Sequence, residues 1–232
     1  MGVAERKRRE FVRREAEILQ ASLALFDGDE WESVTVDQIA TRAEIGKGTV
    51  YKHFASKHEI YARLALDFYE DLLAELHRDD VQADPVGALR HSIGVAFGYH
   101  LVRPEYRRVT QYCARDDFRR RSSAEVGAAF DDLDQRFLEF MAQRLAPGIE
   151  AGVFSDRPPW QLTLGLRATF DGAIALLWGG CVASPNDAEH MTRVFTDYMV
   201  AGVMSHQSES VAQCPDAVAA TLTSRAAAAS ES

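Results

Sequence analysis

The sequence predicts an all-α protein, and three observations lead to this expectation. Apolar residues recur every three or four positions along most of the chain before residue 206, which places them on one face of successive helices. Two segments, Thr35–Gln38 and Ser56–Glu59, fit capping boxes that open helices. Arg103-Pro104 and Pro147-Gly148 stand where helical patterns stop.

The N-terminal part of the pattern predicts four helices separated by short breaks. The first extends from Glu5 to Phe26, and the motif GDEWES ends it. Two short helices are expected at Thr35–Ala43 and Lys47–Phe54. A long helix should begin near Lys57 and continue to about residue 78, because its apolar residues recur every four positions at Leu64, Phe68, Leu72 and Leu76.

The second half of the chain predicts a further series of helices. An apolar stripe indicates a helix from Leu89 to Leu101, and a shorter helix is expected from Pro104 to about Arg115. Residues Val126 to Met141 mark another helix, which Pro147-Gly148 should stop. The residues SDRPP at 155–159 predict a loop before the last two helices.

The last two predicted helices indicate contact with a second subunit. From Trp160 to Trp178 apolar residues occupy every side, and such a helix must be covered all round. The helix after Pro185 is amphipathic. Two helices per subunit would form a four-helix bundle in a symmetric homodimer, unless both simply cover a monomeric core. The residues expected at the dimer interface are Leu166, Ala173, Leu177, Met191, Val194, Phe195, Tyr198 and Gly202.

The composition is that of an ordinary soluble protein. The chain has 232 residues, of which 47% are hydrophobic and 26% charged. It contains no run of eighteen apolar residues, which is about the length needed to span a membrane. The first residues, MGVAERKRREFVRREAE, lack the apolar segment of a secretory signal. The three cysteines show no metal-binding spacing. We therefore expect a cytoplasmic protein without membrane association.

The charge is distributed unevenly. The formal net charge is −9, yet residues 1–60 are close to neutral and residues 61–232 carry nearly all of the excess. Bulk charge therefore does not favour nucleic-acid binding. A nucleic-acid site would have to be a local basic patch on an acidic protein.

The segment IGKGTVYKHFASKHE at 45–59 gathers such a patch. Two short helices joined by the turn AEIG, with a third helix behind them, predict a helix-turn-helix. Gly46 can begin the second short helix, and Gly48 lets it approach a phosphate or base closely. Ile45, Val50 and Phe54 should point into the core. The opposite face can enter a major groove and carries Lys47, Thr49, Tyr51, Lys52 and His53.

Residues 17–72 resemble the DNA-binding domain of the TetR/AcrR family of bacterial transcriptional regulators. The resemblance rests on ALFDGDEWESVTVDQIA followed by AEIGKGTVYKHFASKHEIY, and above all on the pattern Gly-Thr-x-Tyr-x-x-Phe followed by Ser-Lys and an acidic residue. One departure is Glu44, which stands in the turn where the family often has glycine. A left-handed backbone at Glu44 would cost about 1 kcal/mol.

The resemblance implies a sequence-specific repressor of transcription. It would bind a palindromic operator in double-stranded DNA as a homodimer and would leave it when a small-molecule inducer binds the C-terminal domain. Thr35, Tyr51 and Lys57 would grip phosphates, and Gly48 would permit close approach. The residues that would face the groove are Lys47, Thr49, Lys52 and His53.

The composition change RDDVQADP at 78–85 and the resemblance together predict the domain organisation. Residues 1–15 would form a basic flexible arm that reaches the DNA, or else a frayed helix that only aids solubility. The remaining predicted parts are a helix-turn-helix domain at 16–62, a connecting helix from 57 to about 78, a ligand-binding and dimerisation domain at 80–206, and a disordered tail at 207–232.

Inducer contacts are expected where the apolar stripes of the C-terminal domain meet. Most aromatic residues at helical spacing belong to the core. His100, a titratable group on an apolar stripe, also fits an ordinary buried histidine whose hydrogen bonds are satisfied. The candidate pocket residues are Phe97, His100, Tyr112, Phe137, Met141, Phe170 and Trp178.

Other functions remain as alternatives. An activator or a ligand-independent regulator would have the same fold. A helical enzyme is disfavoured because the chain has no nucleophile elbow, phosphate-binding loop or HExxH motif. His100 and Glu105 lack further ligands at workable spacing for a metal. An architectural DNA-binding protein would be expected to be basic overall. We expect no catalytic residue, no cofactor and no metal.

Overall fold

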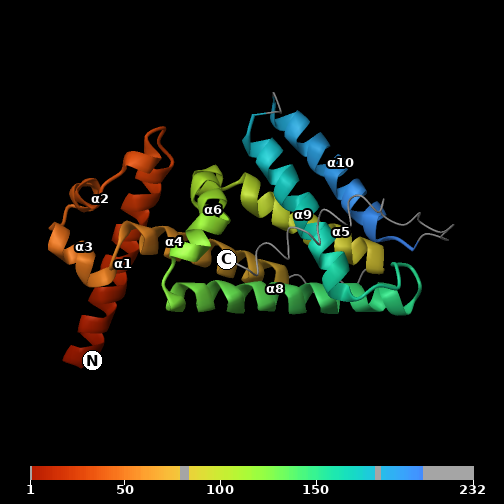
Figure 1. Cartoon of the computed structure of the whole chain (residues 1–232), viewed down its shortest axis with the longest axis horizontal. Coiled ribbons are helices and arrows are strands. Elements are labelled where there is room, and N and C mark those ends of the chain that lie inside the picture. The colour runs from red at the N-terminus through yellow and green to blue at the C-terminus, as the bar shows by residue number, and fades with distance from the viewer. Residues whose placement is uncertain (1, 79–83, 181–183, 206–232) are drawn as a thin grey trace, which may run out of the picture.

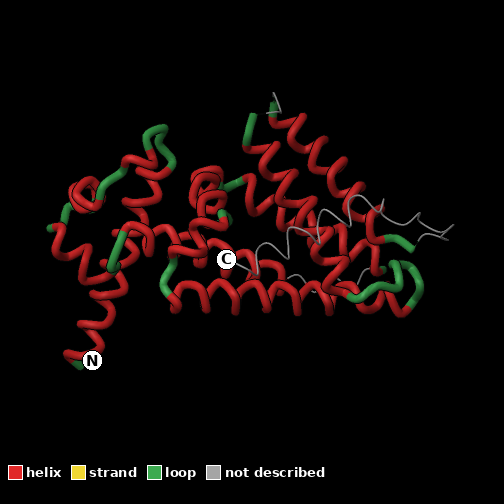
Figure 2. The backbone as a smooth tube through the Cα atoms, in the orientation of Figure 1, coloured by secondary structure: helices red, strands yellow, loops and turns green. Residues whose placement is uncertain are grey.

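The computed structural model describes residues 2–78, 84–180 and 184–205. Over these ranges the regular structure is helical, apart from one isolated antiparallel bridge between Phe154 and Met204. Figure 2 shows the helices and the short loops between them. The prediction of an all-α fold is confirmed. The predicted tail at 207–232 lies outside the described residues.

The first helices form a small group at one end of the molecule, at the left of Figure 1. The last of them, α4, continues from this group into the larger half. Their bounds are α1 Val3–Phe26, η1 Trp31–Ser33, α2 Val36–Arg42, α3 Lys47–His53 and α4 Lys57–Arg78.

The larger half is built from the remaining helices. Figure 1 shows α8 along its lower edge and α9 beside α10 at its far end. The bounds are α5 Pro85–Leu101, η2 Pro104–Tyr106, α6 Arg107–Cys113, α7 Asp116–Arg121, α8 Ala124–Glu150, α9 Pro159–Trp178 and α10 Pro185–Val203. Along the described chain, no helix is both long enough and apolar enough to cross a membrane.

The turn between α2 and α3 forms as the local sequence dictates. Thr35 and Gln38 make the predicted capping box, in which the Thr35 side chain accepts from the Gln38 amide and the Gln38 side chain accepts from the Thr35 amide. After α2, the Ile45 amide donates to the Ala40 carbonyl at 2.9 Å and the Glu44 amide donates to the Thr41 carbonyl at 3.1 Å. This Schellman arrangement requires a left-handed residue, and Glu44 adopts it with φ of 55°.

Residues 3–15 are helical, in agreement with the helix predicted from Glu5; of the two alternatives for residues 1–15, a flexible arm and a helix, the structure has the helix. Side chains three and four positions apart stabilise this first part of α1. Arg13 lies 2.6 Å from Glu10 and 2.8 Å from Glu17, and Arg14 also lies 2.8 Å from Glu17. The glutamates between the arginines therefore favour a helix instead of a flexible arm.

Helix α8 continues past Pro147, where we expected it to stop. A proline inside a helix removes its own amide hydrogen bond and crowds the carbonyl four residues earlier, but the turn after Pro147 still forms. The Ala151 amide donates to the Pro147 carbonyl at 3.1 Å, and the chain then reverses at Gly152, with φ of 69°. Gly148 packs directly beneath the Phe154 ring, so a larger residue at 148 would overlap it.

The segment predicted as one helix from Pro104 to about Arg115 is divided into η2 and α6, and the short helix α7 was missed. Phe118 anchors α7 because its side chain is fully buried. The sequence does carry a signal for α7, since Asp116 and Asp117 lie in its first turn and three arginines lie in its last. Charges of this arrangement oppose the helix dipole and stabilise a short helix.

A single hydrophobic core joins the first three helices to the larger half. It contains Ile18 and Phe26 of α1 and Tyr61 of α4 together with Val109 of α6 and Phe130 of α8. Two further clusters fill the larger half. The packing therefore crosses the boundary predicted at residues 78–85. Whether the two parts fold as separate units stays a prediction.

The left-handed residue Glu44 gives a direct test of the turn. Glycine adopts this conformation without steric cost, so Glu44→Gly should raise the free energy of unfolding by about 1 kcal/mol in chemical denaturation. The matched control is Ala43→Gly, because Ala43 has φ of −82° and gains nothing from glycine. A lower denaturation midpoint for Glu44→Gly than for the unmodified chain would contradict this description of the turn.

Candidate functional site

Helix α3 has one face in the core and the other in solvent. Val50 and Phe54 are buried, and Ile45 packs against the same cluster, as the sequence predicted. Lys47 and Lys52 are exposed on the opposite face. The same exposed face also carries Gly48 and Tyr51, with Thr49 half-buried beside them.

The two lysines on the exposed face of α3 differ in whether they form an ion pair. The Lys47 ammonium lies 2.6 Å from the Asp37 carboxylate of α2, and this hydrogen bond raises the pKa of Lys47. Lys52 makes no ion pair with any described residue. A side chain at Gly48 would meet no atom within 4 Å, so the fold itself does not require glycine there. The face thus has one unpaired cation beside an open stretch of backbone.

His53 does not project into solvent as the sequence suggested. Its ring packs at a tilt against Phe11 of α1, with ring centroids 4.1 Å apart, and its Nδ1 atom is buried without a hydrogen-bond partner in the described chain. The last turn of α3 is thereby attached to α1. This contact is non-local, which explains why the sequence pattern did not reveal it.

Thr35 and Lys57, both predicted to grip phosphates, have structural partners. The Thr35 hydroxyl oxygen accepts from the Gln38 amide at 3.3 Å while remaining at the surface. The Lys57 ammonium donates to the Glu32 carbonyl at 2.8 Å, and partial burial lowers its pKa. Lys57 therefore joins the start of α4 to η1 and is less available than predicted.

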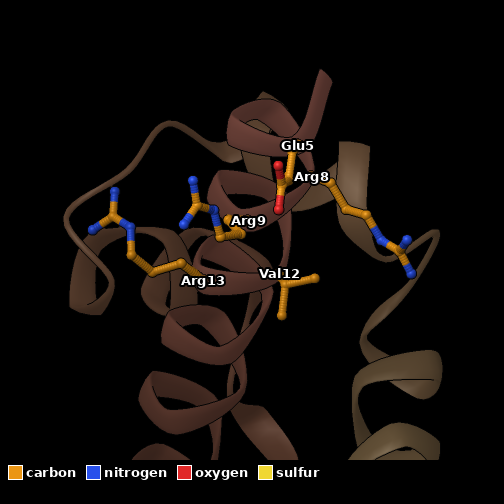
Figure 3. Close-up of a pocket in the computed structure, with 5 residues that line it drawn as sticks. All are labelled: Glu5, Arg8, Arg9, Val12 and Arg13. Carbon is orange, nitrogen blue, oxygen red and sulfur yellow. The ribbon is translucent and has the colours of Figure 1, made fainter. Parts of the chain in front are cut away.

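The first turns of α1 add a second basic surface near α3. Figure 3 shows Arg9 and Arg13 extending to one side of the helix and Arg8 to the other, with Glu5 and Val12 between them. These arginines, for which the sequence left a flexible arm or a frayed helix open, are thus held on a helix.

The larger half contains a partly open cavity of about 610 Å³, lined mainly by α4, α5, α6, α8 and α9, with Arg119 of α7 and Met199 of α10. Most of its wall is apolar. Five of the seven predicted pocket residues line it, namely His100, Phe137, Met141, Phe170 and Trp178.

The other two predicted pocket residues lie elsewhere. Phe97 is fully buried behind Phe170, with ring centroids 4.6 Å apart. Tyr112 packs between Trp31 and Tyr61, at centroid distances of 5.4 Å and 4.9 Å. Tyr112 therefore belongs to the contact between the first helices and α6, whereas its neighbours Gln111 and Cys113 line the cavity.

His100 is a neutral base in an apolar environment. It is 3% exposed, and aromatic rings surround it, including Phe68 at 4.9 Å, Phe170 at 5.1 Å and Trp178 at 5.5 Å between centroids. Its Nδ1 atom lies 2.8 Å from the Ala96 carbonyl. Burial lowers the pKa of His100 to about 4, so the ring is uncharged at neutral pH.

Charged residues also line part of the cavity and pair with one another. Arg167 lies 2.9 Å from Asp134, which also lies 3.0 Å from Arg119. Burial raises the pKa of Asp171, and Arg167 opposes that rise. The sequence signal for this group was present, since Arg167 and Asp171 are the only charges on an otherwise apolar helix.

Helices α9 and α10 keep most of the residues expected at the dimer interface at least partly exposed, but not Leu166 and Ala173. Leu166 and Ala173 are buried within their own chain, because they pack into the core of the larger half. The predicted residue Tyr198 is 70% exposed, and Leu164 and Leu176, which were not predicted, are also exposed. Of the other predicted interface residues, Gly202 is exposed and the half-buried ones are Leu177, Met191, Val194 and Phe195.

An all-helical chain with an N-terminal helix-turn-helix and a larger helical half around a cavity has the architecture of a transcriptional regulator. The profile of the bacterial regulatory proteins of the tetR family matches residues 18–64. The HTH-type transcriptional repressor KstR2 of Mycobacterium tuberculosis is 30% identical over 156 residues, which cover 66% of this chain and 74% of KstR2. The chain belongs to the TetR family of transcriptional regulators.

Solved structures have the same fold. A tetR-family regulatory protein from Rhodococcus RHA1 superposes with a TM-score of 0.67 at 18% identity, covering 84% of this chain and 98% of that one. The regulator FadR from Bacillus subtilis, solved in complex with stearoyl-CoA, gives the same TM-score and identity over 81% of this chain and 98% of FadR. The relatives found by both comparisons are transcriptional regulators.

The buried histidine makes stability depend on pH. Its pKa falls from 6.5 to about 4 on folding, so between these values the unfolded chain binds a proton that the folded chain does not. Stability should therefore fall as the pH drops from about 6.5 towards 4. Chemical denaturation across this range should show a smaller fall for His100→Gln than for the unmodified chain. Parallel curves for the two proteins would contradict the burial of a neutral His100.

Proposed function

We propose that the chain is a repressor that binds a palindromic operator in double-stranded DNA as a homodimer and is released by a small molecule bound in the cavity. The observation that carries the DNA-binding part is the outward face of α3. This face is exposed and basic in a chain whose net charge is −9, and α3 is held by a buried core on its other side.

In this proposal, Lys47, Thr49 and Lys52 face the major groove and Gly48 allows close approach of the backbone. Phosphate contacts come from Thr35 and Tyr51 and fix the position of α3 without reading sequence. Arg8, Arg9 and Arg13 extend the basic surface along α1. We assign His53 and Lys57 positioning roles, because their side chains hold α3 against α1 and α4 against η1.

The homodimer would form through α9 and α10. Their exposed apolar residues Leu164, Leu176 and Tyr198, with Gly202, offer a surface that a second copy can cover. A twofold axis through this surface would present two α3 helices to half-sites one helical turn, about 34–36 Å, apart or at a multiple of that spacing.

Helix α6 provides a route from the cavity to the helix-turn-helix. Thr110 and Cys113 line the cavity, while Tyr112 on the same helix contacts Trp31 and Tyr61. A ligand that favours one position of α6 would shift the population of dimers away from the one that fits DNA. A mostly apolar cavity of about 610 Å³ favours a largely apolar ligand, and FadR of the same fold was solved with stearoyl-CoA.

An activator or a ligand-independent regulator would use the same DNA-binding surface. The name of KstR2 favours repression, since that relative is described as a repressor. The position of the operator relative to the promoter distinguishes repression from activation.

Lys52 should contribute to DNA affinity because it is the unpaired cation on the exposed face of α3. With duplex DNA selected from a random pool, Lys52→Ala should weaken binding about fivefold to tenfold in fluorescence anisotropy. If Lys52 contacts a phosphate, the slope of log affinity against log salt should also fall by about one.

The matched control is Arg78→Ala, which removes one exposed positive charge at the far end of α4. This variant should bind DNA like the unmodified chain at each salt concentration. Equal losses in the two variants would show that only overall charge matters and would contradict the role of α3.

A further inference from the structure

We propose that the cavity recognises an uncharged hydroxyl group on an apolar ligand, and that this hydroxyl donates a hydrogen bond to Nε2 of His100. The inference rests on the proposed ligand-binding function and names the chemistry of the ligand. It is carried by the hydrogen-bonding state of His100 and Trp178 and by the pairing of the charged residues along the cavity wall.

Nε2 of His100 is an acceptor without a partner. The ring is neutral, and its single N–H is at Nδ1, where it donates to the Ala96 carbonyl at 2.8 Å. Nε2 therefore carries a lone pair, and no described residue donates to it. Because His100 lines the cavity, a ligand hydroxyl there can donate to Nε2 in place of water.

The indole N–H of Trp178 is a hydrogen-bond donor that also lacks a partner in the described chain. Trp178 lines the cavity, its ring centroid lies 5.5 Å from that of His100, and its Nε1 atom is buried without a partner in the described chain. A hydroxyl oxygen between the two rings would accept from Nε1 while its hydrogen goes to His100. One hydroxyl would thus pair with the buried Nε1 of Trp178, which is costly when left unpaired, and with the lone pair of His100 Nε2.

Charged ligand groups fit this end of the cavity poorly. A carboxylate has no hydrogen to donate and would face the lone pair of Nε2, and burial holds the pKa of His100 near 4, so the ring stays neutral. The two guanidinium groups that line the cavity, Arg119 and Arg167, are both engaged with Asp134. No unpaired cation along the described wall is left to bind an anion.

The experiment uses displacement of the neutral fluorescent probe N-phenyl-1-naphthylamine from the full chain. The competitors are the isomers 1-nonanol and 1-methoxyoctane, which have the same atoms but differ in the hydroxyl donor, and nonanoate. We expect 1-nonanol to bind about fivefold more tightly than 1-methoxyoctane, the fold-change of one net hydrogen bond. Nonanoate should bind more weakly than 1-nonanol.

The variant His100→Leu should abolish the preference for the alcohol, and His100→Gln, which keeps an acceptor, should retain part of it. The matched control is His77→Leu. His77 also bonds a backbone carbonyl through Nδ1, at 2.7 Å from Leu73, but does not line the cavity. This control should keep the full preference.

Each outcome bears on the inference. Equal affinity for the two isomers in the unmodified chain, or an alcohol preference that survives in His100→Leu, would overturn it while leaving ligand binding intact. Failure of all three competitors to displace a bound probe would overturn it together with the ligand-release part of the proposed function. DNA binding by the same preparation tests the rest of that function separately.

Discussion

The buried contact between Tyr61 and its neighbours is the interaction on which the arrangement of the two candidate sites depends. The Tyr61 ring stacks on Phe26 with centroids 3.9 Å apart, and its hydroxyl donates to the Trp31 carbonyl at 3.1 Å. Tyr112 of α6 lies against the same ring, and the Cys113 thiol is 3.4 Å from the Tyr61 carbonyl. The helix-turn-helix and the cavity wall therefore share one packed core, and core packing tolerates few intermediate arrangements.

The two candidate sites differ in their physical character: one is an exposed surface and the other is a largely buried cavity. On the exposed face of α3, Lys47 pairs with Asp37, and Lys52 makes no ion pair with any described residue. The proposed phosphate contacts would use such exposed cations. The cavity residues are held by packing. Among the described residues, the Trp178 Nε1 atom is buried without a partner, and the Nδ1 atom of His100 bonds the Ala96 carbonyl. The proposed recognition of DNA thus depends on exposure and charge, and the inferred recognition of a ligand depends on burial and hydrogen bonding.

Local signals allowed most of the fold to be predicted from the sequence, and non-local packing explains the rest. The capping box at Thr35 and the exposed face of α3 follow from residues within a few positions of one another. The contact of Phe11 with His53, the place of Tyr112 outside the cavity and the burial of Leu166 and Ala173 depend on segments far apart in the chain. An apolar helix such as α9 does not indicate which of its faces meets its own core, so the expected interface included buried residues.

The most direct test of a shared core is the affinity for selected duplex DNA, measured by fluorescence anisotropy with and without saturating 1-nonanol, in the unmodified chain and in Tyr112→Ala. Coupling through α6 predicts that the ligand weakens DNA binding of the unmodified chain by about fivefold or more and that the effect shrinks in the variant. An unchanged DNA affinity at full occupancy of the cavity, or an equal effect in both proteins, would contradict the proposed coupling.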